Sequence, residues 1–173
     1  RLEELLWVNR ARLEAGQRVS GLRRIVIPSK VDSENRQLTG VRQRLISQRT
    51  KVINRIRHIL LKHNITQEMP TKGIQTIKAA KWLRDLALPE IDRLELDQCL
   101  AQWALIDVQK KLLDQRIASR QEQDAQAQLL ATIPGASVFS SLALSCRIGD
   151  ASRFDSPKSL SHFWGLTPRC RNS

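Results

Sequence analysis

Four basic side chains in the first half of the sequence share one face of an expected helix, where they could bind phosphate groups. They are Arg44, Lys51, Arg55 and Lys62. Between positions 35 and 67 the sequence has eight Lys or Arg residues and no acidic residue. Because an ordinary solvated face mixes both signs, this run predicts contact with the phosphate backbone of nucleic acid. The alternative is the solvated face of a coiled coil.

A second candidate for phosphate binding is the segment LATIPGASVFSSLALSCRIGD, which covers positions 130–150. A short apolar helix end, a Pro-Gly turn at Gly135 and a following helix with small residues resemble a helix-hairpin-helix element. The turn amides of such an element can face a phosphate at a helix N-terminus. Ser137 stands where a second glycine is usual, which argues against close backbone approach. A plain turn between two packed helices is an equal alternative.

Helices must position both candidates, because the composition favours an all-α fold. The seven Gly and six Pro residues are too few for many tight turns, while Leu, Arg, Gln, Ala and Lys abound. Apolar spacing predicts long helices over 34–64 and 90–131, with a shorter helix between them. Short helices over 137–147 and between Ser156 and Gly165 are expected to follow.

Each long helix carries an apolar seam that needs a partner. The first seam is Leu38, Val41, Leu45, Val52, Ile56 and Ile59, and the second is Leu96, Cys99, Trp103, Ile106, Leu113 and Ile117. Such spacing is typical of coiled coils. We expect pairing within one chain, between the chains of a homodimer or higher oligomer, or both. Residues 1–31 then form a terminal helix and linker, residues 32–131 a coiled-coil region for dimerisation and nucleic-acid binding, and residues 132–173 a small helical domain.

Composition narrows the possible partners and compartments. With 29 basic and 17 acidic residues, the formal charge is +12, which favours a polyanionic partner. Aromatic residues are only 4% of the chain, too few to stack successive bases of a single strand. No apolar run approaches the ~20 residues that span a bilayer. We therefore expect a cytoplasmic protein that does not contact a membrane.

The Cys and His residues predict no metal site. Cys99, Cys146 and Cys170 form no Cys-x-x-Cys pair, which argues against zinc and against a disulfide framework. Three histidines, His58, His63 and His162, are expected to serve helix faces or caps rather than metal binding or catalysis. The sequence begins with Arg1 rather than Met and ends in a loop-like stretch, so we expect a piece of a longer protein.

The C-terminal sequence resembles a known family. It contains an IPG turn, an IGD helix end, the pattern RF-x-SP-x-x-L and a GL-x-P-x-x-x-x-S loop, in that order. In this it resembles the DEDD-type insertion-sequence transposases guided by a bridge RNA, the insertion sequence 110 family. The resemblance extends backward through Ile27-Pro28-Ser29 and the Arg-rich helix LISQRTKVINRIRHILLKH, so it covers most of the chain.

The resemblance implies a larger enzyme. Members join a RuvC-like nuclease domain, whose four acidic residues hold Mg²⁺, to a coiled coil for dimerisation and a C-terminal domain with a nucleophilic serine. By position, that serine is Ser173, and Arg169 and Arg171 would stabilise the charge of a scissile phosphate or remain solvated loop charges. Residues 1–31 would follow a nuclease domain that is missing here, and residues 132–173 would be a truncated transposase domain. No cofactor is expected in this piece, and Mg²⁺ is expected in the nuclease domain.

Taken together, these features predict a fragment of a DNA recombinase that binds DNA and a bridge RNA and carries the serine nucleophile for strand transfer. Without its nuclease domain, the fragment is expected to be inactive. One alternative is a non-catalytic nucleic-acid-binding adaptor, and another is a coiled-coil oligomeriser.

Overall fold

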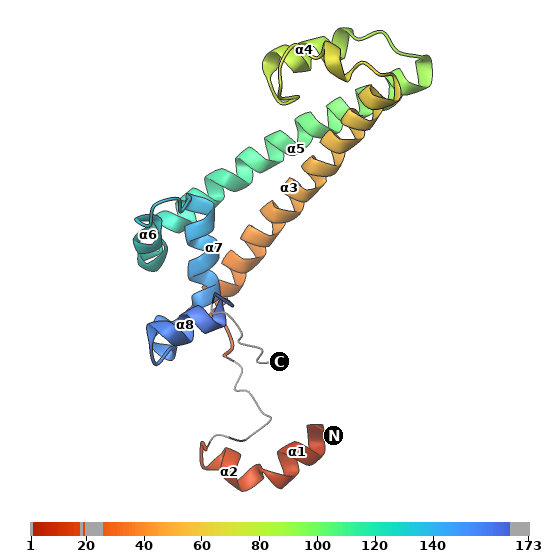
Figure 1. Cartoon of the computed structure of the whole chain (residues 1–173). Coiled ribbons are helices and arrows are strands. Elements are labelled where there is room, and N and C mark those ends of the chain that lie inside the picture. The colour runs from red at the N-terminus through yellow and green to blue at the C-terminus, as the bar shows by residue number, and fades with distance from the viewer. Residues whose placement is uncertain (1, 18, 20–25, 167–173) are drawn as a thin grey trace, which may run out of the picture.

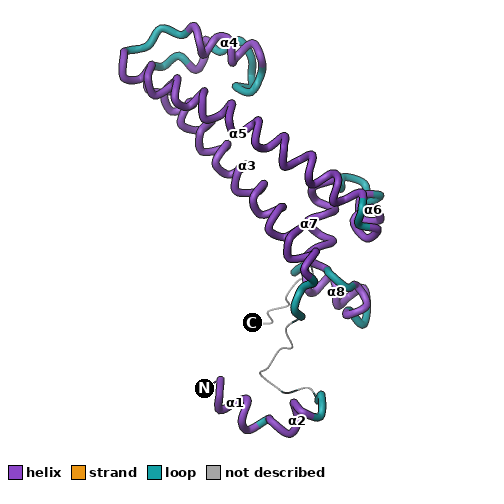
Figure 2. Tube along the Cα trace, turned by 180° about the vertical axis from the view of Figure 1, so that it is seen from behind, coloured by secondary structure: helices purple, strands orange, loops and turns teal. Residues whose placement is uncertain are grey.

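The computed structural model describes residues 2–17, 19 and 26–166, and this part consists of helices joined by loops and turns, with no strand (Figure 2). Its helices are α1 (Leu2–Val8), α2 (Arg10–Glu14), α3 (Lys30–Lys62), α4 (Ile77–Asp85), α5 (Glu90–Glu122), α6 (Ala125–Ala131), α7 (Val138–Ile148) and α8 (Pro157–Phe163). Short 3-10 turns occupy Thr66–Glu68 and Ala151–Arg153. The all-α prediction, with long helices followed by a small helical part, is confirmed.

Two long helices, α3 and α5, run side by side in opposite directions and form a hairpin (Figure 1). Each has 33 residues, so each is about 50 Å long. At one end of the hairpin lies α4, while α6, α7 and α8 gather at the other end (Figure 1). We call these ends the tip and the base. Pairing of the two predicted seams therefore takes place within one chain.

The N-terminal end of α3 is fixed by a cap. Ser29 accepts a hydrogen bond from the backbone amide of Asp32 at 3.0 Å, and its hydroxyl donates to the Asp32 carboxylate at 2.7 Å. Such a cap satisfies one of the amides that a helix start leaves without an intrahelical partner. The helix ends before Asn64, whose φ of +55° lies in the left-handed region. Helix α3 thus begins four residues earlier than the sequence predicts.

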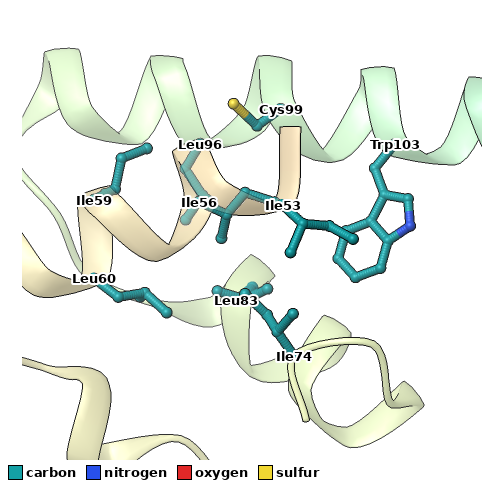
Figure 3. Packing of buried hydrophobic residues seen from close by; sticks show 9 residues of the cluster. All are labelled: Ile53, Ile56, Ile59, Leu60, Ile74, Leu83, Leu96, Cys99 and Trp103. Carbon is teal, nitrogen blue, oxygen red and sulfur yellow. The ribbon is translucent and has the colours of Figure 1, made fainter. Parts of the chain in front are cut away.

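The tip encloses the larger hydrophobic core, in which α4 closes the end of the hairpin (Figure 3). Its buried side chains are Ile53, Ile56, Ile59, Leu60, Ile74, Leu83, Leu96, Cys99 and Trp103. Burying an aliphatic side chain of this size contributes roughly 1.5–3 kcal/mol relative to leaving it in water. The seam predicted on α5 is confirmed here, since Leu96, Cys99 and Trp103 are all buried.

The base is organised by α7, which packs on both long helices. Ile117, Ala127 and Leu142 form a small buried cluster there. Because α7 covers the N-terminal half of α3, the buried face of α3 differs from the predicted seam: Asn35 and Thr39 are buried, whereas Val41 is 37% exposed. The Arg36 side chain, for example, donates to the Cys146 carbonyl of α7 at 2.7 Å.

The expected continuous helix over 90–131 is wrong, because the chain breaks after Glu122. Asp124 begins α6 by accepting a hydrogen bond from the Ala127 amide at 2.9 Å. Ser145 of α7 donates to the other oxygen of the same carboxylate at 2.7 Å. The Asp124 side chain therefore lies at the break after α5, caps α6 and binds α7 through Ser145.

The last described helix follows its sequence signals. Ser156 caps α8 with Pro157 in the first turn, and Gly165, with φ of +69°, follows its end. No residue of α1 or α2 is buried. Within the described ranges, no helix is long and apolar enough to cross a membrane.

Candidate nucleic-acid interface

Arg44 and Lys51 of α3 are exposed side chains, and neither forms an ion pair with another described residue. Lys51 also borders a groove between α3 and α5, beside Arg55. Apolar side chains such as Val52 and Leu105 line the groove, and Gln102 and Gln109 border it on α5. One edge of the groove is thus cationic, which suits a phosphate backbone running along α3.

The other two predicted cations are partly neutralised by acids of α5. Arg55 lies 3.4 Å from the Glu95 carboxylate, with both side chains largely exposed. Lys62 lies 2.8 Å from the carboxylate of Asp92, which is only 11% exposed. An exposed pair such as Arg55–Glu95 is weak and can exchange for a phosphate. Lys62, held by a nearly buried carboxylate, is the less suitable phosphate ligand.

Further ion pairs continue toward the base and were not foreseen from the sequence. Arg42 contacts Asp114 at 2.5 Å, and Arg49 contacts Asp107 at 2.6 Å. The absence of acids from positions 35–62 of α3 therefore reflects complementarity with α5 as well as a candidate phosphate surface. The acidic positions of the 90–131 segment were visible in the sequence, but the register that pairs them with α3 was not.

Asp92 binds Lys62 and His63 at the start of α5. Lys62 donates to both of its carboxylate oxygens, at 2.8 and 2.9 Å, and His63 Nε2 lies 2.8 Å from one of them. The hydrogen bond from Lys62, followed by that from His63, lowers the pKa of Asp92 against the opposing effect of burial. This cluster joins the two long helices next to the tip and leaves Asp92 ionised.

The turn at Gly135, predicted either as a phosphate site or as a plain turn between packed helices, joins α6 to α7. Gly135 is exposed with φ of +86°, a conformation that favours glycine. Ser137 caps α7 by accepting from the Ser140 amide at 3.1 Å, and its own amide donates to the Ser140 hydroxyl at 2.7 Å. The Ala136 amide donates to the Ile133 carbonyl at 2.9 Å. Several turn amides thus already have partners within the protein.

Ser173, Arg169 and Arg171, which the family resemblance singles out, lie outside the described residues. Among the described residues of the C-terminal part, Arg153 is a cation that sequence reasoning missed. Its guanidinium lies over the rings of Phe154 and Phe163, at 4.5 and 4.9 Å from their centroids. The signal for it was the RF pair in the C-terminal pattern.

The His and Cys residues of the described part suggest no catalytic or metal centre. His58 and His162 are exposed, and His63 binds Asp92. Burial raises the pKa of the thiols of Cys99 and Cys146, which keeps them protonated. Within residues 2–17, 19 and 26–166, no group of three or more His, Cys, Asp or Glu side chains is placed to hold a metal ion.

The structure is thus that of a helical protein with a long hairpin, which carries exposed Lys and Arg side chains, and a small helical unit at the base of the hairpin. Within this class, residues 127–173 match the model of the Transposase IS116/IS110/IS902 family. The chain is also 28% identical over 134 residues to "Putative transposase y4pF/y4sB" of Sinorhizobium fredii. That match covers 76% of this chain and 34% of the relative, so the chain spans about a third of the relative's length. No solved structure matches the chain. Residues 127–173 are thus similar to a transposase family, and a larger part of the chain is similar to a putative transposase.

Proposed function

We propose that this chain is a segment of a DNA transposase that binds DNA and a guide RNA and supplies a serine nucleophile for strand transfer. The match of residues 127–173 to a transposase family carries the proposal. The chain spans about a third of its relative's length. Strand transfer, guide-RNA binding and Mg²⁺ binding are therefore proposed for a longer protein that contains this chain. Mg²⁺ would be held by acidic residues outside positions 1–173. The reduced, buried cysteines are consistent with a cytoplasmic location.

The proposed nucleic-acid contact centres on Arg44 and Lys51. They lie seven residues apart on α3, or about 10 Å along the helix, a spacing suited to phosphates several nucleotides apart. Both are exposed and unpaired within the described part, unlike Arg42, Arg49 and Lys62. Arg55 adds a third cation, because its contact with Glu95 is exposed and readily exchanged.

This contact predicts a change in salt dependence when the two unpaired cations are neutralised. In Arg44→Gln/Lys51→Gln, duplex DNA should bind more weakly, and the log–log salt slope should become shallower by about 1.8, since each lost phosphate contact contributes about 0.9. Fluorescence anisotropy between low and moderate salt measures the slope. Circular dichroism should show unchanged helicity, because both side chains are exposed.

The matched control is Lys78→Gln/Lys81→Gln, which removes the same charge from two exposed positions of α4. It should keep most of the original slope. Equal slopes in the two double variants would mean that binding depends on net charge alone, and the interface on α3 would then be rejected.

The proposed chemistry is attack by the Ser173 hydroxyl on a phosphodiester. The serine oxygen bonds to phosphorus, the bond from phosphorus to one DNA oxygen breaks, and that oxygen leaves as a hydroxyl after gaining a proton. The serine proton passes to a general base, since a neutral serine hydroxyl is a weak nucleophile. Arg169 and Arg171 would balance the charge that develops on the phosphate.

Ser173→Ala in the longer protein should abolish a covalent protein–DNA adduct while leaving folding and guide binding intact. The change removes a single hydroxyl group and should have little effect on stability, so the loss of the adduct would be chemical. A denaturing gel with labelled DNA detects the adduct, and Ser161→Ala on α8 is a control that should retain it. An adduct that persists in Ser173→Ala would exclude this serine as the nucleophile. The 173-residue chain alone should bind DNA without cutting it, as a non-catalytic adaptor would.

A further inference from the structure

Arg153 differs from the other half-buried arginines of the described part, because no protein group accepts a hydrogen bond from its guanidinium. The others, each of which donates to a carbonyl or a carboxylate, are Arg36, Arg42, Arg49, Arg93 and Arg120. The Nε atom of Arg153 is buried without a hydrogen-bond partner. None of the ion pairs between described residues includes Arg153. Because a half-buried charge without a counter-ion is costly, this side chain lacks an acceptor that a ligand can supply.

Two aromatic rings hold the Arg153 guanidinium in place. Its central carbon lies 4.5 Å from the centroid of the Phe154 ring and 4.9 Å from that of Phe163, the last residue of α8. The two rings meet edge to face with their centroids 5.4 Å apart, and Trp164 packs on Phe163 in the same manner. Ring faces attract a cation, but they leave its N–H groups without oxygen acceptors. The guanidinium is therefore both restrained and free to donate.

A restrained guanidinium fits a phosphate group. Its N–H donors form a planar fork that matches two oxygens of one phosphate, and holding the fork in advance lowers the entropy lost on binding. Asp150 does not occupy the fork, because its carboxylate accepts from the amide and the hydroxyl of Ser152 at 2.9 and 2.7 Å. A carboxylate of another protein has the same geometry as a phosphate. The formal charge of +12 and the family match of residues 127–173 favour nucleic acid instead.

We infer that Arg153 binds a backbone phosphate of the nucleic acid, positioned by the rings of Phe154 and Phe163. The inference rests on the proposed function, since it adds a phosphate contact for the same nucleic acid. Helix α8, which contributes Phe163, lies at the base of the hairpin (Figure 1). Arg44 and Lys51 lie on α3 between the base and the tip. The Arg153 contact would therefore bring the nucleic acid onto the small helical unit as well as the hairpin.

Inorganic phosphate tests the anion site without nucleic acid. The Nε–Hε resonance of Arg153 in the 173-residue chain is identified by its absence from the spectrum of Arg153→Gln. Phosphate should shift this resonance, and chloride at the same ionic strength should not, because only phosphate offers two oxygens to the fork. In Phe163→Leu, which removes a ring that is 49% exposed, phosphate should bind severalfold more weakly. The absence of a shift would overturn the anion site, and unchanged binding in Phe163→Leu would overturn the role of the rings.

Duplex DNA tests whether the phosphate belongs to nucleic acid. Arg153→Gln should weaken binding about tenfold at moderate salt and make the log–log salt slope shallower by about 0.9, the contribution of one phosphate contact. Arg153→Lys should recover part of the affinity, because it keeps the charge without the fork. Lys158→Gln is the matched control, since it removes one charge from an exposed position of α8 and should keep the slope. Circular dichroism should show the same helicity in all three variants.

The two assays distinguish a failure of this inference from a failure of the proposed function. A shallower slope in Arg44→Gln/Lys51→Gln with an unchanged slope in Arg153→Gln would overturn the Arg153 contact and leave the interface on α3 in place. If phosphate shifts the Arg153 resonance and the DNA slope does not change, the fork binds another anion, such as a carboxylate of a protein partner. The assignment to nucleic acid would then be rejected. A chain that binds phosphate at Arg153 and binds no DNA would refute the proposed function itself.

Discussion

Asp92 shows how one residue ties together groups that the sequence separates. Its carboxylate joins the end of α3 to the start of α5 through Lys62 and His63, thirty and twenty-nine positions earlier. Asp92 lies in the first turn of α5 and is itself nearly buried. Its lowered pKa means that the folded chain prefers the ionised carboxylate more strongly than the unfolded chain does.

The Asp92 cluster predicts a specific dependence of stability on pH. Because the folded-state pKa is lowered, the stabilisation is fully present above the unfolded value of about 3.9 and is lost as pH falls through the folded pKa. Asp92→Asn should therefore melt at a lower temperature than wild type at pH 7, and the difference should shrink toward pH 3. Differential scanning calorimetry across this range gives the comparison.

A suitable reference is Glu68→Gln, which removes an exposed acid near the same end of the hairpin. Its melting temperature should follow wild type at every pH. If Asp92→Asn instead lowers the melting temperature by the same amount at pH 3 and at pH 7, the effect comes from the shape of the side chain and not from its ionisation.

At the scale of elements, the position of α7 depends on the interruption between α5 and α6. Asp124 holds the Ala127 amide with one oxygen and the Ser145 hydroxyl with the other. The sequence did contain an aspartate followed by a helix-forming run, which is a capping signal. This capping signal was not recognised, because the residues on both sides of Asp124 favour a helix. Only the packing of α7, which holds the same carboxylate, favours the interruption.

Removal of this side chain should destabilise the base. Asp124→Ala should lower the free energy of unfolding by about 1–2 kcal/mol, the range for a lost cap and a lost hydrogen bond. Urea denaturation measures the change. In the double variant Asp124→Ala/Ser145→Ala, the loss should be smaller than the sum of the two single losses, because the single changes remove the same hydrogen bond. Strict additivity would mean that the bond does not contribute.

Element boundaries and core faces were predictable to different degrees. Helix α8 was foreseen from Ser156, Pro157 and Gly165, since these residues encode their own local geometry. The seam of α5 was also foreseen, because the same face of the helix meets its partners at the tip and at the base. The buried face of α3 was not, because α3 packs on α5 at the tip and also on α7 at the base. Asn35 and Thr39 are buried there by an element more than 100 positions away in the sequence.

At the scale of the whole molecule, the formal charge of +12 overstates the charge that is free to meet a partner. The sequence located the basic residues of the first half and the acidic residues of 90–131. The hairpin brings these two sets together, so Arg42, Arg49 and Lys62 form ion pairs, while Arg44 and Lys51 have no ion-pair partner in the part of the chain that the structure describes. Which cations stay exposed depends on the register of two helices, a property that spacing within either helix alone does not determine.

The length of the hairpin sets a scale for what the molecule can touch. Helix α3 has 33 residues between the base and the tip, and its length of about 50 Å equals the rise of about fifteen base pairs of B-form DNA. Helix α6, in which the family match begins, lies at the base, and α4 lies at the opposite end (Figure 1). A duplex running along α3 would therefore advance by about one and a half helical turns between the base and the tip. The two ends would then face different grooves on the same side of the DNA.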